Sequence, residues 1–187
     1  VIYHGSRILE GVQEFVNWMI ENDEKFVFLT NSAERTPHEL SMKLERMGLS
    51  VSADHFYTSA MATAEFLATQ SPGCTAYVIG EAALSKALYD HGIYMNDVNP
   101  EYVVIGETRT YSFEKIEKFK IKNILVPHHG LLTEEESAFY LKYGKLNAIE
   151  TATQISQSLK NGVPKTEILE QFKEKYYDEK VREIYPI

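Results

Sequence analysis

The stretch Phe26-Val27-Phe28-Leu29-Thr30-Asn31-Ser32 indicates the fold class. Four apolar residues lead directly into a hydroxyl, an amide and a second hydroxyl, a pattern typical of a buried strand that ends at a polar edge. A helix start follows, with Thr36 as N-cap, Pro37 at the first helical position and Glu39 three residues after the cap. Because α/β proteins bind anions where such a strand ends beside a helix, Thr30, Asn31 and Ser32 are candidate phosphate-binding residues.

Strand and helix patterns alternate on both sides of this stretch. Apolar runs predict strands at 26–29, 76–79 and 102–105, with shorter extended segments at 1–3 and 56–57. Helical spacing predicts helices at 8–20, 37–47, 60–68, 81–89 and 113–118. Such alternation is typical of βαβ units, so the predicted fold class is α/β with a mainly parallel sheet.

The pattern changes near Phe119, and the rest of the chain reads as a mainly helical tail. One strand is predicted at 124–126, and Thr133 with Glu136 forms a capping box that opens a helix through 139–141. Two further amphipathic helices are predicted at 146–159 and from 165 to about 177. The tail is therefore expected to hold one strand and three helical stretches.

Composition excludes several classes of protein. Of the 187 residues, 44% are apolar and 25% charged, and no apolar run reaches the ~20 residues of a membrane span. The net charge of −8 arises entirely in residues 1–118, where nine Lys and Arg face seventeen Asp and Glu; this argues against nucleic-acid binding there. A single cysteine, Cys74, allows no internal disulfide, which favours the cytoplasm, and we expect a packed or surface thiol rather than a nucleophile.

Residues 1–118 resemble the NagD-like phosphatases of the haloacid dehalogenase superfamily, in consistent order. The segments that carry the resemblance are 1–5, 29–31, 56–64, 76–81 and 99–109. It implies a Rossmann-like core over residues 1–74, the start of an α/β cap over 75–118, and hydrolysis of small phosphate esters such as nucleotide or sugar monophosphates. By the same resemblance Thr30 binds the transferring phosphoryl group with Asn31 beside it, and Mg²⁺ is the cofactor.

The chain departs from that family pattern at the catalytic carboxylates. The resemblance implies an aspartate nucleophile and an aspartate acid/base just before the residues that match 1–3, and neither is in this sequence. The lysine motif and the acidic Mg²⁺-binding motif do not appear after Lys118 either. Since positioned donors alone cannot carry phosphoryl transfer, we expect phosphate binding without turnover.

The segment from about 122 to 187 resembles the C-terminal part of a metallo-β-lactamase-fold hydrolase. That resemblance makes His128 or His129, with His129 preferred, a zinc ligand after strand 124–126, although the upstream His-x-His-x-Asp-His cluster is absent. Residues 119–187 are therefore predicted to have a different origin from the first part. Two alternatives to the phosphatase stay open: a non-catalytic or chimeric α/β scaffold, and a metal-dependent hydrolase built on the histidine pair.

The expected partner is a small phosphorylated molecule, with no nucleic acid and no membrane. A second copy of the chain is a further candidate, because incomplete sheets have open edges that favour pairing. Gly80-Glu81 and Gly106-Glu107 both follow predicted strands, and neither extends to a nucleotide-binding glycine pattern. We interpret both pairs as turns that lead from a strand to a helix.

Overall fold

The computed structural model describes residues 2–126 and 130–176. The chain divides into two compact units, Val1–Phe119 and Lys120–Ile187, which are described separately. The finer division of the first unit into a core over 1–74 and a cap over 75–118 stays a prediction. Among the described residues, no helix is long and apolar enough to cross a membrane.

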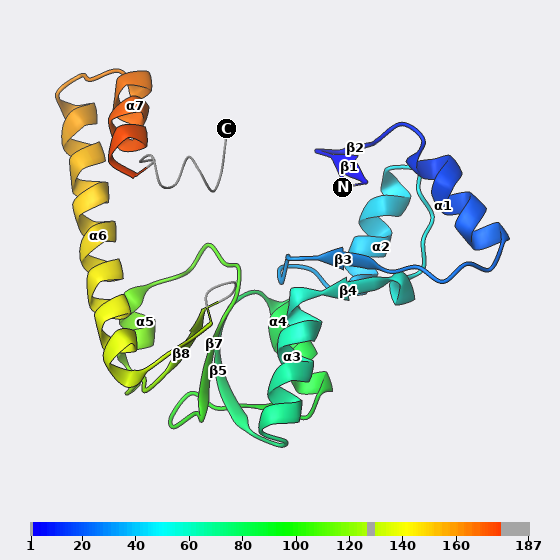
Figure 1. Cartoon of the computed structure of the whole chain (residues 1–187), viewed down its shortest axis with the longest axis horizontal. Coiled ribbons are helices and arrows are strands. Elements are labelled where there is room, and N and C mark those ends of the chain that lie inside the picture. Colours follow the sequence, from blue (N-terminus) through cyan, green and yellow to red (C-terminus); the bar gives the residue numbers. More distant parts are fainter. Residues whose placement is uncertain (1, 127–129, 177–187) are drawn as a thin grey trace. The chain divides into compact units, whose positions relative to one another are not determined.

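The N-terminal half of the first unit holds a short hairpin and a parallel strand pair (Figure 1). Its elements are β1 (Tyr3–His4), β2 (Arg7–Ile8), α1 (Val12–Glu21), β3 (Phe28–Thr30), α2 (Pro37–Arg46), the 3₁₀ turn η1 (Ala53–His55) and β4 (Phe56–Thr58). β3 runs parallel to β4, and the register places Thr30 beside Thr58. One hydrophobic core, which includes Val16, Leu44 and Leu49, joins this half together.

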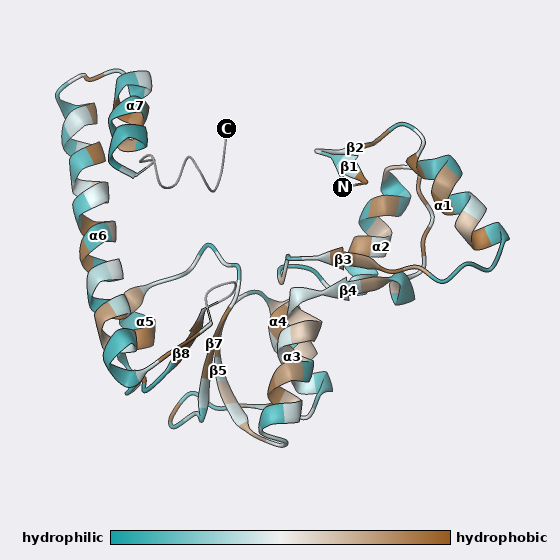
Figure 2. Cartoon of the chain, in the orientation of Figure 1, coloured by the Kyte–Doolittle hydropathy of each residue, from teal (hydrophilic) through white to brown (hydrophobic). Residues whose placement is uncertain are grey.

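The C-terminal half of the first unit is a three-stranded parallel sheet with its helices. The elements are α3 (Ser59–Gln70), β5 (Thr75–Ile79), α4 (Ala82–Asp90), β6 (Tyr94–Met95), β7 (Tyr102–Ile105) and α5 (Phe113–Glu117). The strand order is β6-β5-β7, and both strand pairs are parallel. Small residues on α3 and α4, such as Ala64 and Ala87, let these elements approach closely in a second core. Figure 2 shows extensive hydrophobic ribbon on α3 and α4.

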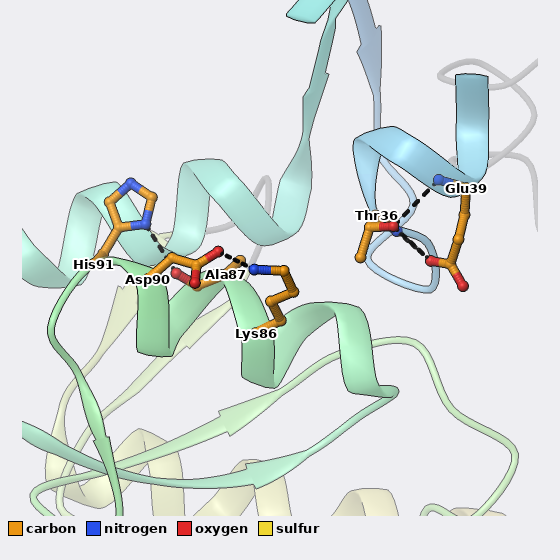
Figure 3. Close-up of polar contacts among 6 residues, drawn as sticks. All are labelled: Thr36, Glu39, Lys86, Ala87, Asp90 and His91. Atoms are coloured by element: carbon orange, nitrogen blue, oxygen red, sulfur yellow. Dashed lines mark hydrogen bonds and ion pairs between the residues drawn. The ribbon is translucent and has the colours of Figure 1, made fainter. Parts of the chain in front are cut away.

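Helix α4 ends in two local contacts of its last turn, drawn in Figure 3. The Lys86 ammonium lies 2.7 Å from an Asp90 carboxylate oxygen, and His91 Nδ1 lies 2.8 Å from the Ala87 carbonyl oxygen. The ion pair is exposed on both sides, so it contributes only about 0.3–0.5 kcal/mol. The His91 ring donates a hydrogen bond to the Ala87 carbonyl oxygen, one of the last carbonyls of the helix, which have no partner within it.

The second unit consists of a hairpin and two helices. β8 (Ile124–Val126) pairs antiparallel with β9 (Gly130–Leu132), and α6 (Glu134–Lys160) and α7 (Lys165–Tyr176) follow. The Tyr176 hydroxyl joins the two helices through hydrogen bonds of 2.9 Å with Asn147 Oδ1 and with Thr151 Oγ1. Figure 2 shows scattered hydrophobic positions along the otherwise polar α6.

The structure confirms an α/β fold with parallel sheets and a helical C-terminal region. Five details of the sequence prediction are wrong. The strand predicted at 26–29 is β3, Phe28–Thr30, and it is not buried, since Leu29 is 76% exposed. Ile8 belongs to strand β2, so the first helix begins only at Val12. Strand β6 was not predicted, and the tail holds a second strand, β9. The helices predicted through 139–141 and at 146–159 are one continuous helix, α6.

The predicted capping box at the start of α2 is confirmed (Figure 3). Glu39 N donates to Thr36 Oγ1 at 3.2 Å, and Thr36 N donates to the Glu39 carboxylate at 2.7 Å. The Thr36 hydroxyl donates to the same carboxylate oxygen at 2.8 Å. These donors, the Thr36 backbone N–H first, lower the pKa of Glu39 below its ordinary value of about 4.3.

The lowered pKa makes the contribution of Glu39 to stability depend on pH. A carboxylate whose pKa is lower in the folded state stabilises the fold above its unfolded pKa, and this contribution is lost as pH falls through the folded value. We expect Glu39→Gln to lower the free energy of unfolding at pH 7, with a difference from wild type that disappears as pH falls through the lowered pKa of Glu39. Urea denaturation at several pH values measures this difference in the free energy of unfolding. Glu45→Gln, an exposed carboxylate on the same helix, is the control and should show no such dependence.

Candidate functional site

The candidate site lies where β3 and β4 end. Because the two strands are parallel, their carboxyl ends meet at one edge, with Thr30 beside Thr58. Thr58 is buried, and its hydroxyl accepts from Met61 N at the start of α3. Thr30 is partly buried and the next residue, Asn31, is exposed. The loop after β3 is therefore open to a ligand on the side of these two residues.

Two hydrogen bonds hold the conformation of this loop. Ser32 N donates to Thr30 Oγ1 at 3.2 Å, and Ser59 Oγ, from the first residue of α3, donates to the Asn31 carbonyl oxygen at 2.8 Å. Thr30 Oγ1 acts as an acceptor in the first bond, so its own O–H is left to donate to a ligand. The Asn31 amide carries two further donors. Thr30 and Asn31 thus offer positioned donors to an anion.

Ser32 has a different environment from the one the sequence suggests. Its hydroxyl donates to Glu107 Oε2 at 3.0 Å and accepts from Glu34 N at 3.2 Å. A hydroxyl has a single proton, so in this conformation Ser32 has none to offer a phosphate. Ser32 therefore acts as a link between the loop after β3 and the residue that follows β7.

Close packing of the backbone brings Glu107 to this loop. A Cβ atom at Gly106 would lie 2.6 Å from Leu84 Cδ2 and 3.7 Å from Ala33 Cβ, and one at Gly80 would lie 2.9 Å from the same Leu84 methyl. Gly106 N also donates to the Ile79 carbonyl oxygen at 2.9 Å. The end of β7 therefore packs against the loop that carries Ala33, and a side chain at either glycine would require the Leu84 side chain to shift.

A second carboxylate lies at the neighbouring strand end. The Thr108 hydroxyl donates to Glu81 Oε1 at 3.0 Å, so the segments after β5 and β7 are joined as well. Gly80 and Glu81 lead from β5 into α4, as predicted, with Glu81 as N-cap. Sequence reasoning treated Gly106-Glu107 only as a turn and missed its contact with Ser32. The signal was present: a carboxylate two residues after a strand that runs parallel to its neighbour.

The described residues do not form a metal site. Among them, no group of three or more His, Cys, Asp or Glu side chains could hold a metal ion. The residues present therefore do not fit a magnesium ion, and we derive no step through one. His128 and His129, the candidate zinc ligands, lie outside the described residues.

Cys74 is a packed thiol, which is one of the two positions that the sequence left open. It is 2% exposed and belongs to the second core of the first unit. Burial raises the pKa of the thiol above its ordinary value, with a smaller contribution from Glu101. Because the thiolate is the reactive form, this position disfavours a nucleophilic role.

Comparison with known proteins places this chain in a family. A model described as haloacid dehalogenase-like hydrolase matches residues 1–94, half of the chain. The chain belongs to the haloacid dehalogenase-like hydrolases. The strand end at Thr30 lies within the matched residues, as does Thr58 of β4.

Curated relatives of this haloacid dehalogenase-like chain are phosphatases. Dihydroxyacetone phosphatase of Corynebacterium glutamicum (strain R) is 43% identical over 116 residues, which are 62% of this chain and 42% of that protein. Ribonucleotide monophosphatase NagD of Escherichia coli (strain K12) is 40% identical over 118 residues, 63% of this chain and 47% of NagD. The chain thus spans less than half the length of these relatives.

Solved structures support the same family. The structure of NagD from E. coli K-12 superposes with a TM-score of 0.59 over 63% of this chain and 47% of that one. A NagD-type structure with 23% identity covers 88% of this chain at a TM-score of 0.60, so the likeness in fold continues past residue 119. The glycerol phosphate phosphatase of Mycobacterium tuberculosis, 20% identical with a TM-score of 0.57, was solved in complex with magnesium.

These findings confirm the NagD-like resemblance of the haloacid dehalogenase-like chain. The resemblance of residues 122–187 to a metallo-β-lactamase-fold hydrolase is unsupported by them. The alternatives built on a chimeric scaffold or on the histidine pair are accordingly not favoured.

Proposed function

We propose that this chain binds the phosphoryl group of small phosphate monoesters through Thr30 and Asn31. The observation that carries the proposal is the parallel strand end itself: Thr30 lies beside Thr58, and a bond from Ser59 to the Asn31 carbonyl oxygen holds the loop. Hydroxyl and amide donors at such an edge form charge-assisted hydrogen bonds to phosphate oxygens. Ser32 supports the loop and does not donate to the phosphate, because its hydroxyl already donates a hydrogen bond to Glu107.

The substrate class follows from the relatives. Their names give dihydroxyacetone phosphate and ribonucleotide monophosphates as substrates, and both are small monoesters that carry hydroxyl groups. We therefore propose triose, sugar or nucleoside monophosphates as ligands of this chain. The excess of acidic residues in the first 118 positions agrees with a small ligand rather than a nucleic acid. We propose the cytoplasm as the compartment, since a single cysteine forms no internal disulfide.

Binding and hydrolysis are separate parts of the proposal. Thr30 and Asn31 supply donors only, whereas hydrolysis also needs a nucleophile and groups that stabilise the charge of the transition state. At these strand ends, the carboxylates of Glu81 and Glu107 each accept a hydrogen bond from a hydroxyl group. We therefore propose phosphate binding as the activity of this sequence, and the absence of turnover remains a prediction.

A titration of the full chain with inorganic phosphate tests the binding site. A ligand that binds only the folded state raises stability by about 2.7 kcal/mol at a hundred times its Kd, so we expect the melting temperature to rise with phosphate concentration. Sodium chloride at matched ionic strength is the control and should give no comparable rise. A melting temperature that is the same in phosphate and in chloride would contradict the proposal and favour a scaffold without an anion site.

A further inference from the structure

We propose that Glu107 is a specificity-determining residue of this phosphate site and selects monoesters whose organic part carries hydroxyl groups. The inference rests on the proposed function, since it assumes that a phosphate binds at Thr30 and Asn31. It goes beyond that function because it assigns a role to the segment after β7. The observation behind it is the hydrogen bond from Ser32 Oγ to Glu107 Oε2, which joins residues 75 positions apart.

The position of this carboxylate is built into the backbone. Gly106, directly before Glu107, packs against Ala33 and Leu84, and both of those side chains are buried. The Gly106 N–H is held by the Ile79 carbonyl oxygen. Glu107 therefore follows a fixed segment, although its own side chain is exposed.

Only one residue separates this carboxylate from the proposed phosphate donor. Glu107 Oε2 lies 3.0 Å from Ser32 Oγ, and Ser32 N lies 3.2 Å from Thr30 Oγ1. A phosphate that binds Thr30 therefore carries its organic part past a carboxylate that is one residue away. Among the described residues, the hydrogen bond to Glu107 Oε2 is the one that the carboxylate accepts, which leaves Oε1 for a ligand.

The charge on Glu107 determines which organic parts are favoured. An ionised carboxylate accepts hydrogen bonds and donates none, so it favours hydroxyl groups on the ligand. The carboxylate repels a second negative charge on the ligand. Next to an alkyl group it loses bound water and gains no hydrogen-bond donor in return. A hydroxylated monoester compensates for the repulsion between phosphate and carboxylate, whereas a plain alkyl monoester does not.

The test compares two esters of equal carbon number in the full-length chain. Isothermal titration calorimetry measures Kd for glycerol 3-phosphate, which carries two hydroxyl groups, for n-propyl phosphate, which carries none, and for inorganic phosphate. For wild type we expect glycerol 3-phosphate to bind about 10-fold more tightly than n-propyl phosphate, the effect of one hydrogen bond to a charged group. For Glu107→Ala we expect the two esters to bind equally.

Two further variants keep the test sharp. Glu107→Gln keeps the size and removes the charge, so it should bind inorganic phosphate more tightly than wild type and discriminate less between the esters. Glu101→Gln is the matched control, because Glu101 precedes β7 and its carboxylate accepts from the Thr75 hydroxyl at 3.3 Å. It should keep the wild-type ratio.

The outcomes separate the two proposals. Phosphate binding with the same ester ratio in wild type, Glu107→Ala and Glu107→Gln would overturn the role of Glu107 and leave the phosphate site standing. A wild-type ratio near one would overturn it as well. If inorganic phosphate fails to bind wild type, the proposed function fails and the selectivity falls with it.

Discussion

Replacing Leu84 with alanine should lower the free energy of unfolding by about 2–5 kcal/mol, the range for truncating a buried leucine. Leu84 is 2% exposed and belongs to the core formed by α3, α4 and the β5–β7 sheet. One of its methyl groups occupies the space that Gly80 and Gly106 leave by having no side chain. The loss should be large because backbone borders this space, and backbone closes a cavity less readily than side chains do.

Urea denaturation followed by circular dichroism measures this loss. Leu29→Ala is the matched control, since Leu29 is 76% exposed in β3 and should change stability by no more than about 0.5 kcal/mol. A loss below about 1 kcal/mol for Leu84→Ala would contradict the tight packing of Leu84 against the two glycines. Leu84→Ala should also weaken the hydrogen bond between Ser32 and Glu107, because Gly106 loses its packing against the Leu84 side chain.

Thr30→Val should weaken the binding of inorganic phosphate by about 10- to 100-fold. Valine keeps the shape of threonine and removes the hydroxyl that we propose as a phosphate donor, and a hydrogen bond to a charged group contributes about 1.5–3 kcal/mol. The variant also removes the acceptor of the Ser32 N–H, so the loop should lose part of its order. Calorimetric titration of the full chain measures the change in Kd.

A control separates this effect from a general loss of stability. Thr69→Val removes an exposed hydroxyl that donates to the Phe66 carbonyl oxygen. Thr69 lies in the last turn of α3, at the opposite end of the helix from Ser59. This variant should bind phosphate as wild type does. If Thr30→Val binds phosphate as tightly as wild type, Thr30 is not a phosphate donor, whatever the melting temperatures of the two variants.

Local signals in the sequence predicted much of the first unit. The capping box of Thr36 and Glu39 and the proline after it fix the start of α2 through contacts within four residues, so neighbours in sequence suffice. Strand β7 was predicted with its observed bounds, Tyr102–Ile105, because four β-branched and aromatic residues stand together. The strand-end pattern gave the place of the candidate site at Thr30, and the family resemblance gave Thr30 its expected role.

The errors arose where strand pairing or packing overrides the local sequence pattern. Ile8 suits the helical spacing of residues 8–20, but pairing with Tyr3 makes it part of a hairpin. Gly144 falls between the two helices predicted in the tail, and the structure continues through it as α6, since one glycine costs a helix only about 1 kcal/mol. The Ser32–Glu107 bond joins loops 75 residues apart, and no local pattern encodes it.

The segment from Phe28 to Ala33 contacts both hydrophobic cores of the first unit. Phe28, in the strand before the loop, packs against the core that includes Val16 and Leu44. Ala33 itself is a member of the other core, with Leu84 and Ala64. The six residues from Phe28 to Ala33 therefore connect two cooperative regions. A phosphate bound at Thr30 would stiffen this connection, so occupancy of the site and the cooperativity of unfolding would be thermodynamically linked.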